Sequence, residues 1–216
     1  RMELMRVDFL ANASHELKTP LASLSGFIET LKGHARDDPK ARDRFLDIMA
    51  TQADRMSRLV SDLLSLSRIE LNEHIPPAGR VDLARAAADV VDAVSVLSAE
   101  RQVAVTLMDR AASAPVSGDR DEILQVVQNL VDNAIKYSLV GGTVDLTVRH
   151  GLDIEAAAAS RVPGATRLSL LTPDREAGAR YVVVTVRDYG PGMAREHLPR
   201  LTERFYRVEG QKSGER

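Results

Sequence analysis

Residues 7–31 read VDFLANASHELKTPLASLSGFIETL, and leucine recurs every seven residues through this stretch, from Leu10 to Leu31. A second set of apolar residues keeps the same spacing and comprises Val7, Leu21 and Ile28. Two apolar positions in every seven residues are typical of a long helix that packs along a seam against another helix. The stretch therefore predicts a long helix with a two-helix seam.

A second helix is predicted after residues 33–39, GHARDDP, where glycine and proline interrupt the repeat. Its apolar seam comprises Phe45, Met49, Met56, Leu59, Leu63 and Leu66. A helical hairpin with one narrow apolar stripe per helix buries too little surface to be stable alone. We therefore expect a homodimer in which two all-α hairpins form a four-helix bundle.

Residues 73–80, EHIPPAGR, contain two prolines and a glycine after the second helix pattern ends. Such a stretch marks a linker, so we expect one domain at residues 1–72 and another at residues 81–216. Helix and strand patterns alternate in the second domain. The helix patterns cover 83–97 and 121–137, and the strand patterns cover 103–108, 143–149 and 181–187. Helices on one antiparallel-looking sheet, an α+β sandwich, are expected.

Composition excludes several classes of function. Charged side chains make up 28% of the chain, yet the formal net charge is only −2, which gives no general attraction to nucleic acid. The chain has no cysteine, so disulfides and thiolate metal sites are excluded. No apolar run approaches the roughly 20 residues that cross a bilayer, so we expect no membrane contact within this chain.

The first helix carries a candidate nucleophile, His15, which falls just off the predicted seam and should point to solvent. Histidine is partly unprotonated near pH 7, and a neutral imidazole nitrogen can attack phosphorus. Glu16 can hydrogen-bond the imidazole and accept charge, and Thr19 at i+4 can position a water for the reverse hydrolysis. One helix face therefore offers groups for phosphorylation and for dephosphorylation.

This histidine also has ordinary interpretations. A lone surface histidine on a helix is common, and Pro20 can simply end a helix. A zinc-protease motif needs a second histidine four residues after the first, but that position is Thr19. The zinc interpretation is therefore excluded, while the structural one remains open at this point.

A second candidate site lies in residues 129–138, NLVDNAIKYS, which place Asn129, Asn133 and Lys136 on one helix face. Amide oxygens can coordinate a Mg²⁺ ion that keeps most of its waters and bridges triphosphate oxygens, and a lysine offsets phosphate charge. Asn133 is the predicted metal ligand. A solvated polar face of an amphipathic helix would give the same pattern.

A third candidate follows the apolar strand pattern YVVVTV at 181–186, where residues 188–193 read DYGPGM. The Asp188 carboxylate can accept a hydrogen bond from the exocyclic amine of adenine, and would then select adenine over guanine. Gly190 and Gly192 let the backbone approach the base. Aspartate and glycine after a strand also make ordinary turns, so this motif alone does not establish a nucleotide site.

Four segments in this order resemble the H, N, G1 and F boxes of sensor histidine kinases. They are HELKTP at 15–20, NLVDN with KY at 129–137, DYGPG at 188–192 and RFYR at 204–207. The resemblance extends over nearly the whole chain. It implies a dimerising hairpin followed by an ATP-binding domain of the gyrase, chaperone and kinase superfamily. The sequence LTERFYRV at 201–208 is similar to the corresponding segment of phosphate-regulon sensor kinases.

The resemblance also implies roles for the histidine segment and a partner. His15 would receive the γ-phosphoryl group of ATP with help from Glu16, and Thr19 would support phosphatase activity. The implied partner is the receiver domain of a response regulator, which has an acceptor aspartate. The implied enzyme is a protein-histidine kinase in the cytoplasmic portion of a protein that other segments tether to the inner membrane.

For the nucleotide, the resemblance implies that Asn129 and Asn133 serve Mg²⁺ and the phosphates. It also implies that Tyr137 and Asp188 flank the adenine. The cofactors expected from these assignments are ATP and Mg²⁺.

Two departures from the family pattern affect these expectations. The chain stops at Arg216, before the second glycine-rich segment that closes over the ATP phosphates in the family. Because positioning supplies most of the catalysis in phosphoryl transfer, we expect this chain to autophosphorylate poorly or not at all. The insertion at 151–180, where relatives have a short turn, is expected to be a loop with one extra strand at 167–171.

Two other functions remain open on the sequence. One is a dimeric scaffold that docks a response regulator for phosphotransfer without using ATP. The other is a structural coiled-coil adaptor whose second domain has lost its ligand. Nucleotide affinity separates the kinase from both, because only the kinase needs to bind Mg·ATP.

Overall fold

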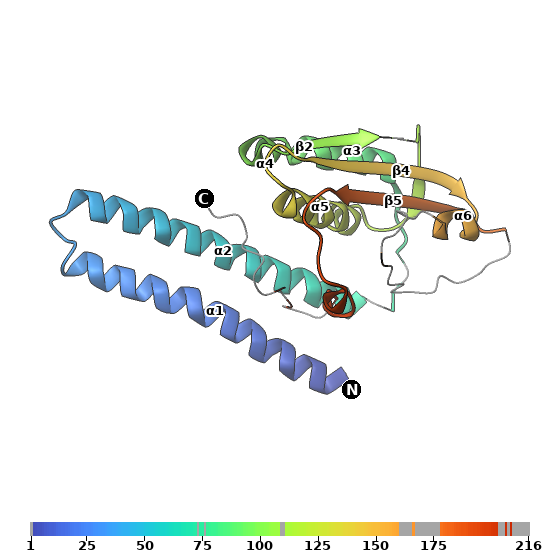
Figure 1. The fold of residues 1–216 in the computed structure, drawn as a ribbon. Coiled ribbons are helices and arrows are strands. Elements are labelled where there is room, and N and C mark those ends of the chain that lie inside the picture. The colour runs from blue at the N-terminus through green and yellow to red at the C-terminus, as the bar shows by residue number, and fades with distance from the viewer. Residues whose placement is uncertain are drawn as a thin grey trace. The chain divides into compact units, whose positions relative to one another are not determined.

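The computed structural model describes residues 2–72, 74–75, 77–108, 111–159, 166, 178–202, 206 and 208. The expected strand at 167–171, most of the insertion at 151–180 and the F-box segment except Tyr206 lie outside the described residues. The chain forms two compact units, Arg1–Pro76 and Pro77–Arg216 (Figure 1). Each unit has its own fold.

The first unit is a hairpin of two helices, α1 at Met2–Lys32 and α2 at Pro39–Asn72 (Figure 1). α2 begins where the Asp38 carboxylate accepts hydrogen bonds from the N–H groups of Lys40 and Ala41 at 3.0 and 3.1 Å. An acidic N-cap satisfies donors that every helix start leaves open, and proline suits the first helical position. The predicted break between the two helices is confirmed.

The seam of this hairpin uses residues three and four apart along α1. The side chains on it are Leu17, Pro20, Leu24, Phe27 and Leu31, all half-buried or buried. The rings of Phe27 and Phe45 meet across the seam, with centroids 5.4 Å apart. The prediction that Leu21 and Ile28 lie in this seam is wrong for the single chain, where they are 54% and 44% exposed. Pro20 and Phe27, one residue earlier, occupy that seam position instead.

The hairpin has almost no interior of its own. Among its described side chains, only Pro20 and Ala35 are buried. A set of large apolar side chains remains exposed on both helices, and we call it the outer stripe: Leu21, Ile28, Leu46, Val60 and Leu64. Leu21 and Ile28 in α1 are seven residues apart, and Leu46 and Val60 in α2 are fourteen apart. The heptad pattern therefore also includes residues outside the seam.

The second unit contains short helices and strands in mixed order. In chain order they are β1 (Arg80–Asp82), α3 (Leu83–Ala93), α4 (Ser95–Arg101), β2 (Ala104–Met108), β3 (Pro115–Ser117), α5 (Arg120–Tyr137), β4 (Thr143–Leu152), α6 (Ile154–Ala158), β5 (Tyr181–Asp188) and the 3₁₀ helix η1 (Arg195–Arg200). The helix predicted at 83–97 is divided into α3 and α4 at Val94, which is 2% exposed. The sequence has no glycine or proline at this break that would predict it.

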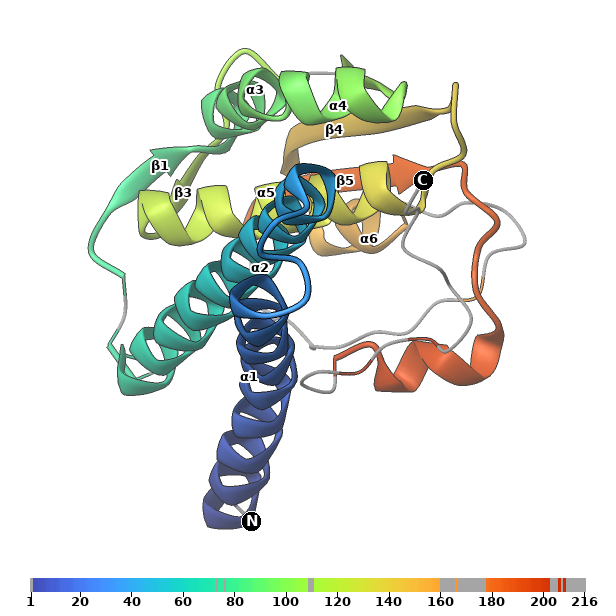
Figure 2. The same ribbon diagram turned by 90° about the vertical axis from the view of Figure 1, so that its left-hand side faces the viewer.

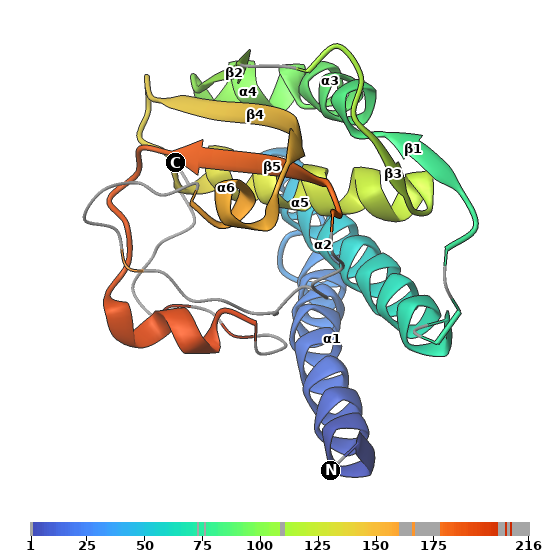
Figure 3. The same ribbon diagram turned by 90° about the vertical axis from the view of Figure 1, so that its right-hand side faces the viewer.

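The strands of the second unit form two sheets (Figures 2 and 3). β1 and β3 make a small antiparallel pair, and the larger sheet has the order β2-β4-β5. β4 and β5 are antiparallel, as predicted, but β2 and β4 are parallel. The antiparallel expectation fails there because α5 lies between β2 and β4 in sequence and provides the crossover that parallel strands require.

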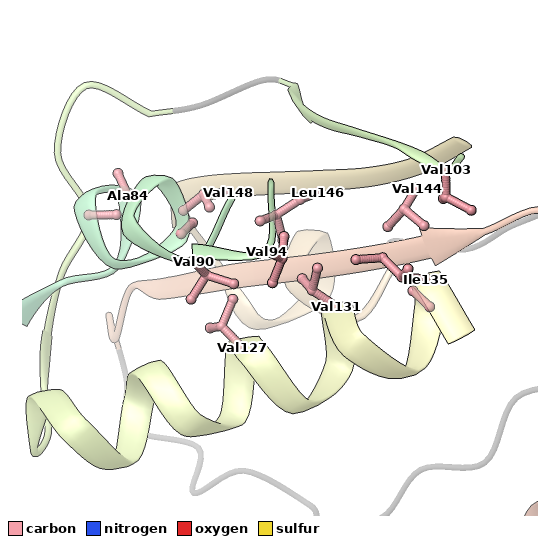
Figure 4. Packing of buried hydrophobic residues seen from close by; sticks show 13 residues of the cluster. Ala84, Val90, Val94, Val103, Val127, Val131, Ile135, Val144, Leu146 and Val148 are labelled. Atoms are coloured by element: carbon pink, nitrogen blue, oxygen red, sulfur yellow. The ribbon is translucent and has the colours of Figure 1, made fainter. Parts of the chain in front are cut away.

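One hydrophobic core joins α3, α5 and the larger sheet (Figure 4). Along β4 the alternate residues Val144, Leu146 and Val148 are fully buried, as expected for a strand with one face covered. They pack with residues of one stripe of α5, namely Val127, Val131, Ala134 and Ile135. The expected helices on one sheet are confirmed. None of the helices in the described ranges is long and apolar enough to cross a membrane.

Candidate functional site

The histidine segment lies in the middle of α1, and its side chains are accessible. His15 and Thr19 are exposed, and Glu16 is half-buried. The Thr19 hydroxyl donates to the backbone carbonyl of His15 at 3.3 Å, the usual back-bond of a threonine in a helix. The imidazole of His15 is therefore accessible to solvent in the single chain.

Glu16 has a neighbour that the sequence reasoning missed. Its Oε2 lies 3.6 Å from Nη2 of Arg55 on α2, and the two side chains are 41% and 48% exposed. An ion pair this exposed contributes at most about 1 kcal/mol, so it does not lock the carboxylate away from His15. The sequence signal was the position of Arg55 directly before the seam residue Met56, as Glu16 lies directly before the seam residue Leu17.

In the second unit, α5 presents the predicted amide face outward. Asp119 caps the helix by accepting from the N–H groups of Asp121 and Glu122 at 2.9 and 3.1 Å. With the apolar stripe of α5 turned to the core, Asn129 and Asn133 are exposed. Both asparagines are thus exposed on this helix, and their role as ligands of Mg²⁺ and phosphates stays a prediction.

The last turn of α5 brings a cation and an aromatic ring together. Lys136 and Tyr137 are half-buried, and Nζ of Lys136 lies 5.1 Å from the centroid of the Tyr137 ring. Tyr137 follows Asn133 by four residues, so the two share one side of the helix. Asp132, one residue before Asn133, is half-buried, and this burial raises the pKa of its carboxyl above the usual value.

No acidic cluster accompanies these amides. Among the described residues, no group of three or more His, Cys, Asp or Glu side chains could hold a metal ion. A divalent cation at the amide face of α5 would take amide oxygens of the asparagines together with water and oxygens of the ligand itself. Mg²⁺ at nucleotide sites keeps several waters and binds phosphate oxygens, and an asparagine can be one of its protein ligands.

The DYGPG segment turns directly against the end of α5. Asp188 is the last residue of β5 and is exposed, and its Oδ1 accepts from the N–H of Gly190 at 2.9 Å. A Cβ atom added to Gly190 would collide with the carbonyl oxygen of Tyr137. Gly192 has a φ of 72°, which favours glycine. The structure therefore brings Asp188 and Gly190 close to the Tyr137 carbonyl, and Lys136 and the two asparagines lie on the same helix as Tyr137.

The segment after this turn has its own contacts. Nδ1 of His197 in η1 lies 2.6 Å from the Tyr206 hydroxyl, and the Arg200 guanidinium lies 4.1 Å from the centroid of the Tyr206 ring. Leu198 of η1 is half-buried, whereas Leu201 is 46% exposed. Phe205 lies outside the described residues.

Two family models match the chain, one for each unit. Residues 5–72 match the His Kinase A (phospho-acceptor) domain, which includes His15, and residues 118–216 match the Histidine kinase-, DNA gyrase B-, and HSP90-like ATPase, which includes the α5 and Asp188 site. The chain belongs to the sensor histidine kinase family. The helical hairpin of this kinase core is thus the part that matches the phospho-acceptor domain, and the sheet domain is the part that matches the ATPase domain.

Curated relatives cover the kinase core from end to end. It is 34% identical over 213 residues to the phosphate regulon sensor protein PhoR of Pseudomonas aeruginosa, a match that covers 99% of this chain and 42% of the relative. It is 32% identical over 214 residues to the sensor-like histidine kinase SenX3 of Mycolicibacterium smegmatis, covering 99% of this chain and 48% of the relative. The chain thus spans less than half the length of these two sensor kinases.

Solved structures support the fold of the histidine kinase core. The Acinetobacter baumannii histidine kinase AdeS superposes with a TM-score of 0.56 at 24% identity, covering 84% of this chain and 76% of that chain. The histidine kinase ThkA, solved in complex with the response regulator TrrA, gives a TM-score of 0.54 at 24% identity, covering 65% of this chain and 41% of that chain. At this level of identity, the likeness concerns the fold alone.

Proposed function

We propose that this chain is the catalytic core of a sensor histidine kinase that uses ATP to phosphorylate His15 and then passes the phosphoryl group to an aspartate of a response regulator. The observation that carries the proposal is the exposed His15 beside Glu16 within the phospho-acceptor domain. The ATPase-type domain, with Asp188 and Gly190 against Tyr137, supplies the matching nucleotide site. Residues 1–72 would form the dimerisation and phosphotransfer domain, 73–80 the linker and 81–216 the ATP-binding domain.

The first reaction is an in-line displacement at the γ-phosphorus of ATP. An unprotonated imidazole nitrogen of His15 attacks phosphorus, and the bond from phosphorus to the β,γ-bridging oxygen breaks as ADP leaves. The imidazole then carries a positive charge, with the proton on its second nitrogen. The Glu16 carboxylate, on the next residue of α1, is suited to hydrogen-bond that nitrogen and stabilise the charge.

Recognition of the nucleotide would divide between the end of β5 and α5. Asp188 accepts a hydrogen bond from the exocyclic amine of adenine, and Tyr137 lies against the base. Gly190 and Gly192 keep the turn free of side chains, so the backbone can approach the ligand. Lys136, at the end of the same helix, offsets negative charge of the phosphates.

The proposed cofactors are ATP and Mg²⁺. The exposed amides of Asn129 and Asn133 fit an ion whose remaining ligands are water and phosphate oxygens, and Asn133 is the proposed direct ligand. Bound in this way, Mg²⁺ would neutralise charge on the triphosphate. The amides themselves would hold the phosphate end of the nucleotide close to the exposed face of α5.

In the second reaction, a carboxylate oxygen of the receiver aspartate attacks the phosphorus on His15. The nitrogen–phosphorus bond breaks, neutral histidine is regenerated and an aspartyl phosphate forms. The complex of ThkA with its response regulator supports this choice of partner. Thr19, one turn after His15 on the exposed face of α1, would position a water for the reverse hydrolysis of the regulator. The similarity to the phosphate regulon sensor protein PhoR supports a phosphate-regulon type of sensor.

The proposed assembly is a homodimer through the first unit. The outer stripe leaves five large apolar side chains in water on a hairpin with almost no interior. Burying such a side chain is worth about 1.5–3 kcal/mol, so covering the stripe with a second copy would stabilise both hairpins. We also propose that the core works in the cytoplasm, where ATP is supplied, as part of a protein tethered to the inner membrane.

Binding of Mg·ADP tests the nucleotide part of this proposal. Saturating Mg·ADP should raise the melting temperature of the wild-type chain, because a ligand at 100 times its Kd adds about 2.7 kcal/mol to folding stability. The shift should disappear in Asp188→Asn, because its single acceptor oxygen is held by the Gly190 N–H and its NH2 donor then faces the adenine amine. GDP should give little shift in either protein. A wild-type chain that binds no adenine nucleotide would contradict the kinase and leave the ATP-independent scaffold.

A further inference from the structure

Tyr189, between Asp188 and Gly190, makes a contact across the sheet that the motif does not predict. Its hydroxyl donates to Oδ2 of Asp145 on β4 at 2.6 Å, over a separation of 44 residues. This short bond to a carboxylate is of the stronger, charge-assisted kind. Burial contributes little to it, since Tyr189 is 46% exposed. The contact therefore depends on the positions of the two side chains and not on burial away from water.

The register of the sheet explains how this contact arises. Asp145 lies directly opposite Arg187 in the antiparallel pair of β4 and β5. The neighbours of Asp145 on β4, Val144 and Leu146, are fully buried, so Asp145 points to the opposite face of the sheet. Tyr189 lies two residues after Arg187 and reaches the same face.

Arg187 completes the cluster. Its guanidinium lies 4.6 Å from the centroid of the Tyr189 ring, a cation–π distance. Hydrogen bonding to Asp145 raises the pKa of the Tyr189 hydroxyl above its usual value, so the proton that makes the bond stays in place at neutral pH. We refer to Asp145, Arg187 and Tyr189 as the tyrosine anchor.

The tyrosine anchor and the core hold the DYGPG turn from two sides. On the core side, Gly190 lies against the carbonyl of Tyr137, and its N–H binds the Asp188 carboxylate. On the opposite face, Tyr189 ties the same turn to β4. Asp188 lies between the two attachments, so its carboxylate orientation depends on both.

We propose that Tyr189, held by Asp145 and Arg187, is a positioning residue that orients the Asp188 carboxylate toward the adenine amine. The inference rests on the proposed nucleotide site, because it assigns the cause of that site's base selectivity. Tyr189 itself touches no reacting atom. Its effect should therefore appear in the discrimination between adenine and guanine nucleotides and not in the fold.

The first test needs no nucleotide. In Tyr189→Phe the ring stays over Arg187 but the hydrogen bond to Asp145 is lost, so amide hydrogen exchange across residues 188–193 should become about threefold faster or more. Tyr181→Phe, the same change at the other end of β5, is the matched control and should leave that exchange unchanged. Unchanged exchange in Tyr189→Phe would overturn the anchor.

The second test measures base selectivity by competition of ADP and GDP against a fluorescent ADP analogue. Tyr189→Phe and Asp145→Ala should each lower ADP affinity about fivefold while GDP affinity hardly changes. The double variant should be no weaker than either single one, because both remove the same bond. Asp145→Asn keeps an acceptor oxygen and should restore most of the selectivity.

The outcomes separate the inference from the function on which it rests. If wild-type protein binds ADP and Asp188→Asn does not, but Tyr189→Phe keeps full selectivity, the inference is overturned and the nucleotide site stands. Equal losses of ADP and GDP affinity, with a lower melting temperature, would indicate a purely structural tyrosine and also overturn it. A wild-type protein that binds no ADP would overturn the nucleotide site and the inference together.

Discussion

Single residues in this chain take their roles from the atoms around them. His15 and Asp188 are both exposed, and the carboxylate of Asp188 takes its direction from the hydrogen bond that it accepts from the Gly190 N–H. Asp82 shows the same principle applied to stability. It caps α3 and also binds the segment before β3, through the N–H of Ala114 at 3.0 Å and the hydroxyl of Ser113 at 2.9 Å.

These hydrogen bonds make the stability of the second unit depend on pH. The Ala114 N–H and then the Ser113 hydroxyl lower the pKa of Asp82 below its usual value. A carboxyl with a lowered folded-state pKa stabilises the fold above its unfolded pKa, near 3.9, and loses that contribution as pH falls through the folded value. Asp82→Asn should therefore have a lower urea midpoint than wild type at pH 7. At pH 3, where the wild-type protein has lost part of this contribution, the difference between the two midpoints should be smaller.

The matched control for this titration is Asp92→Asn, an exposed aspartate on the same helix α3. It removes the same charge and should leave the pH dependence of the urea midpoint close to that of wild type. A constant difference between Asp82→Asn and wild type from pH 7 to pH 3 would show that the carboxylate charge of Asp82 has no part in stability.

At the level of elements, the sequence predicted those features that depend on residues close together in the chain. Glycine and proline at 33–39 gave the turn of the hairpin, and the alternation in β4 gave its buried face. The break at Val94 was missed because its cause is burial, not a turn residue. The parallel pairing of β2 with β4 and the anchoring of Tyr189 on Asp145 join residues about 40 apart, and no periodicity within one segment encodes such contacts.

The same limit applies to the candidate site. The motif residues Asn133, Tyr137 and Asp188 were visible in the sequence because each segment has its own spacing. The closeness of Asp188 to Tyr137 was not visible, because it depends on the fit of Gly190 against the carbonyl of Tyr137. Arg55 was missed for a similar reason, since its partner Glu16 lies on the other helix.

The start of α5 provides a test at this scale, because this helix carries the asparagines and Tyr137. Asp119→Ala removes the side-chain acceptor for two helix N–H groups and should cost about 1 kcal/mol of unfolding free energy. Gln128→Ala, at an exposed position of the same helix, should stay within about 0.5 kcal/mol of wild type. Equal effects of the two changes in urea denaturation would refute the capping role.

For the molecule as a whole, the two units differ in how they are stabilised. The second unit has a contiguous core of α3, α5 and β4 residues, whereas the first has a seam and an uncovered outer stripe. In the proposed homodimer, a second copy would cover the outer stripe of the hairpin that carries His15. Assembly and presentation of His15 are therefore linked in the proposed homodimer.

The assembly is tested by placing charge in the outer stripe. Leu21→Glu should shift the protein from dimer to monomer in sedimentation velocity, because an unpaired carboxylate buried between hairpins is strongly unfavourable. Val96→Glu, at a 69% exposed apolar position of α4 in the other unit, should leave the dimer intact. A Leu21→Glu protein that sediments as wild type would place the dimer contact elsewhere.

Labelling with γ-phosphate tests the central claim most directly. Wild-type protein, His15→Gln and Asp188→Asn are incubated with γ-labelled Mg·ATP, and the protein-bound label is scored for stability in acid and in alkali. The account predicts weak label at most on wild type, labile in acid and stable in alkali as a phosphorus–nitrogen bond requires, and none on either variant. Label that persists in His15→Gln, or wild-type label that is stable in acid, would contradict it.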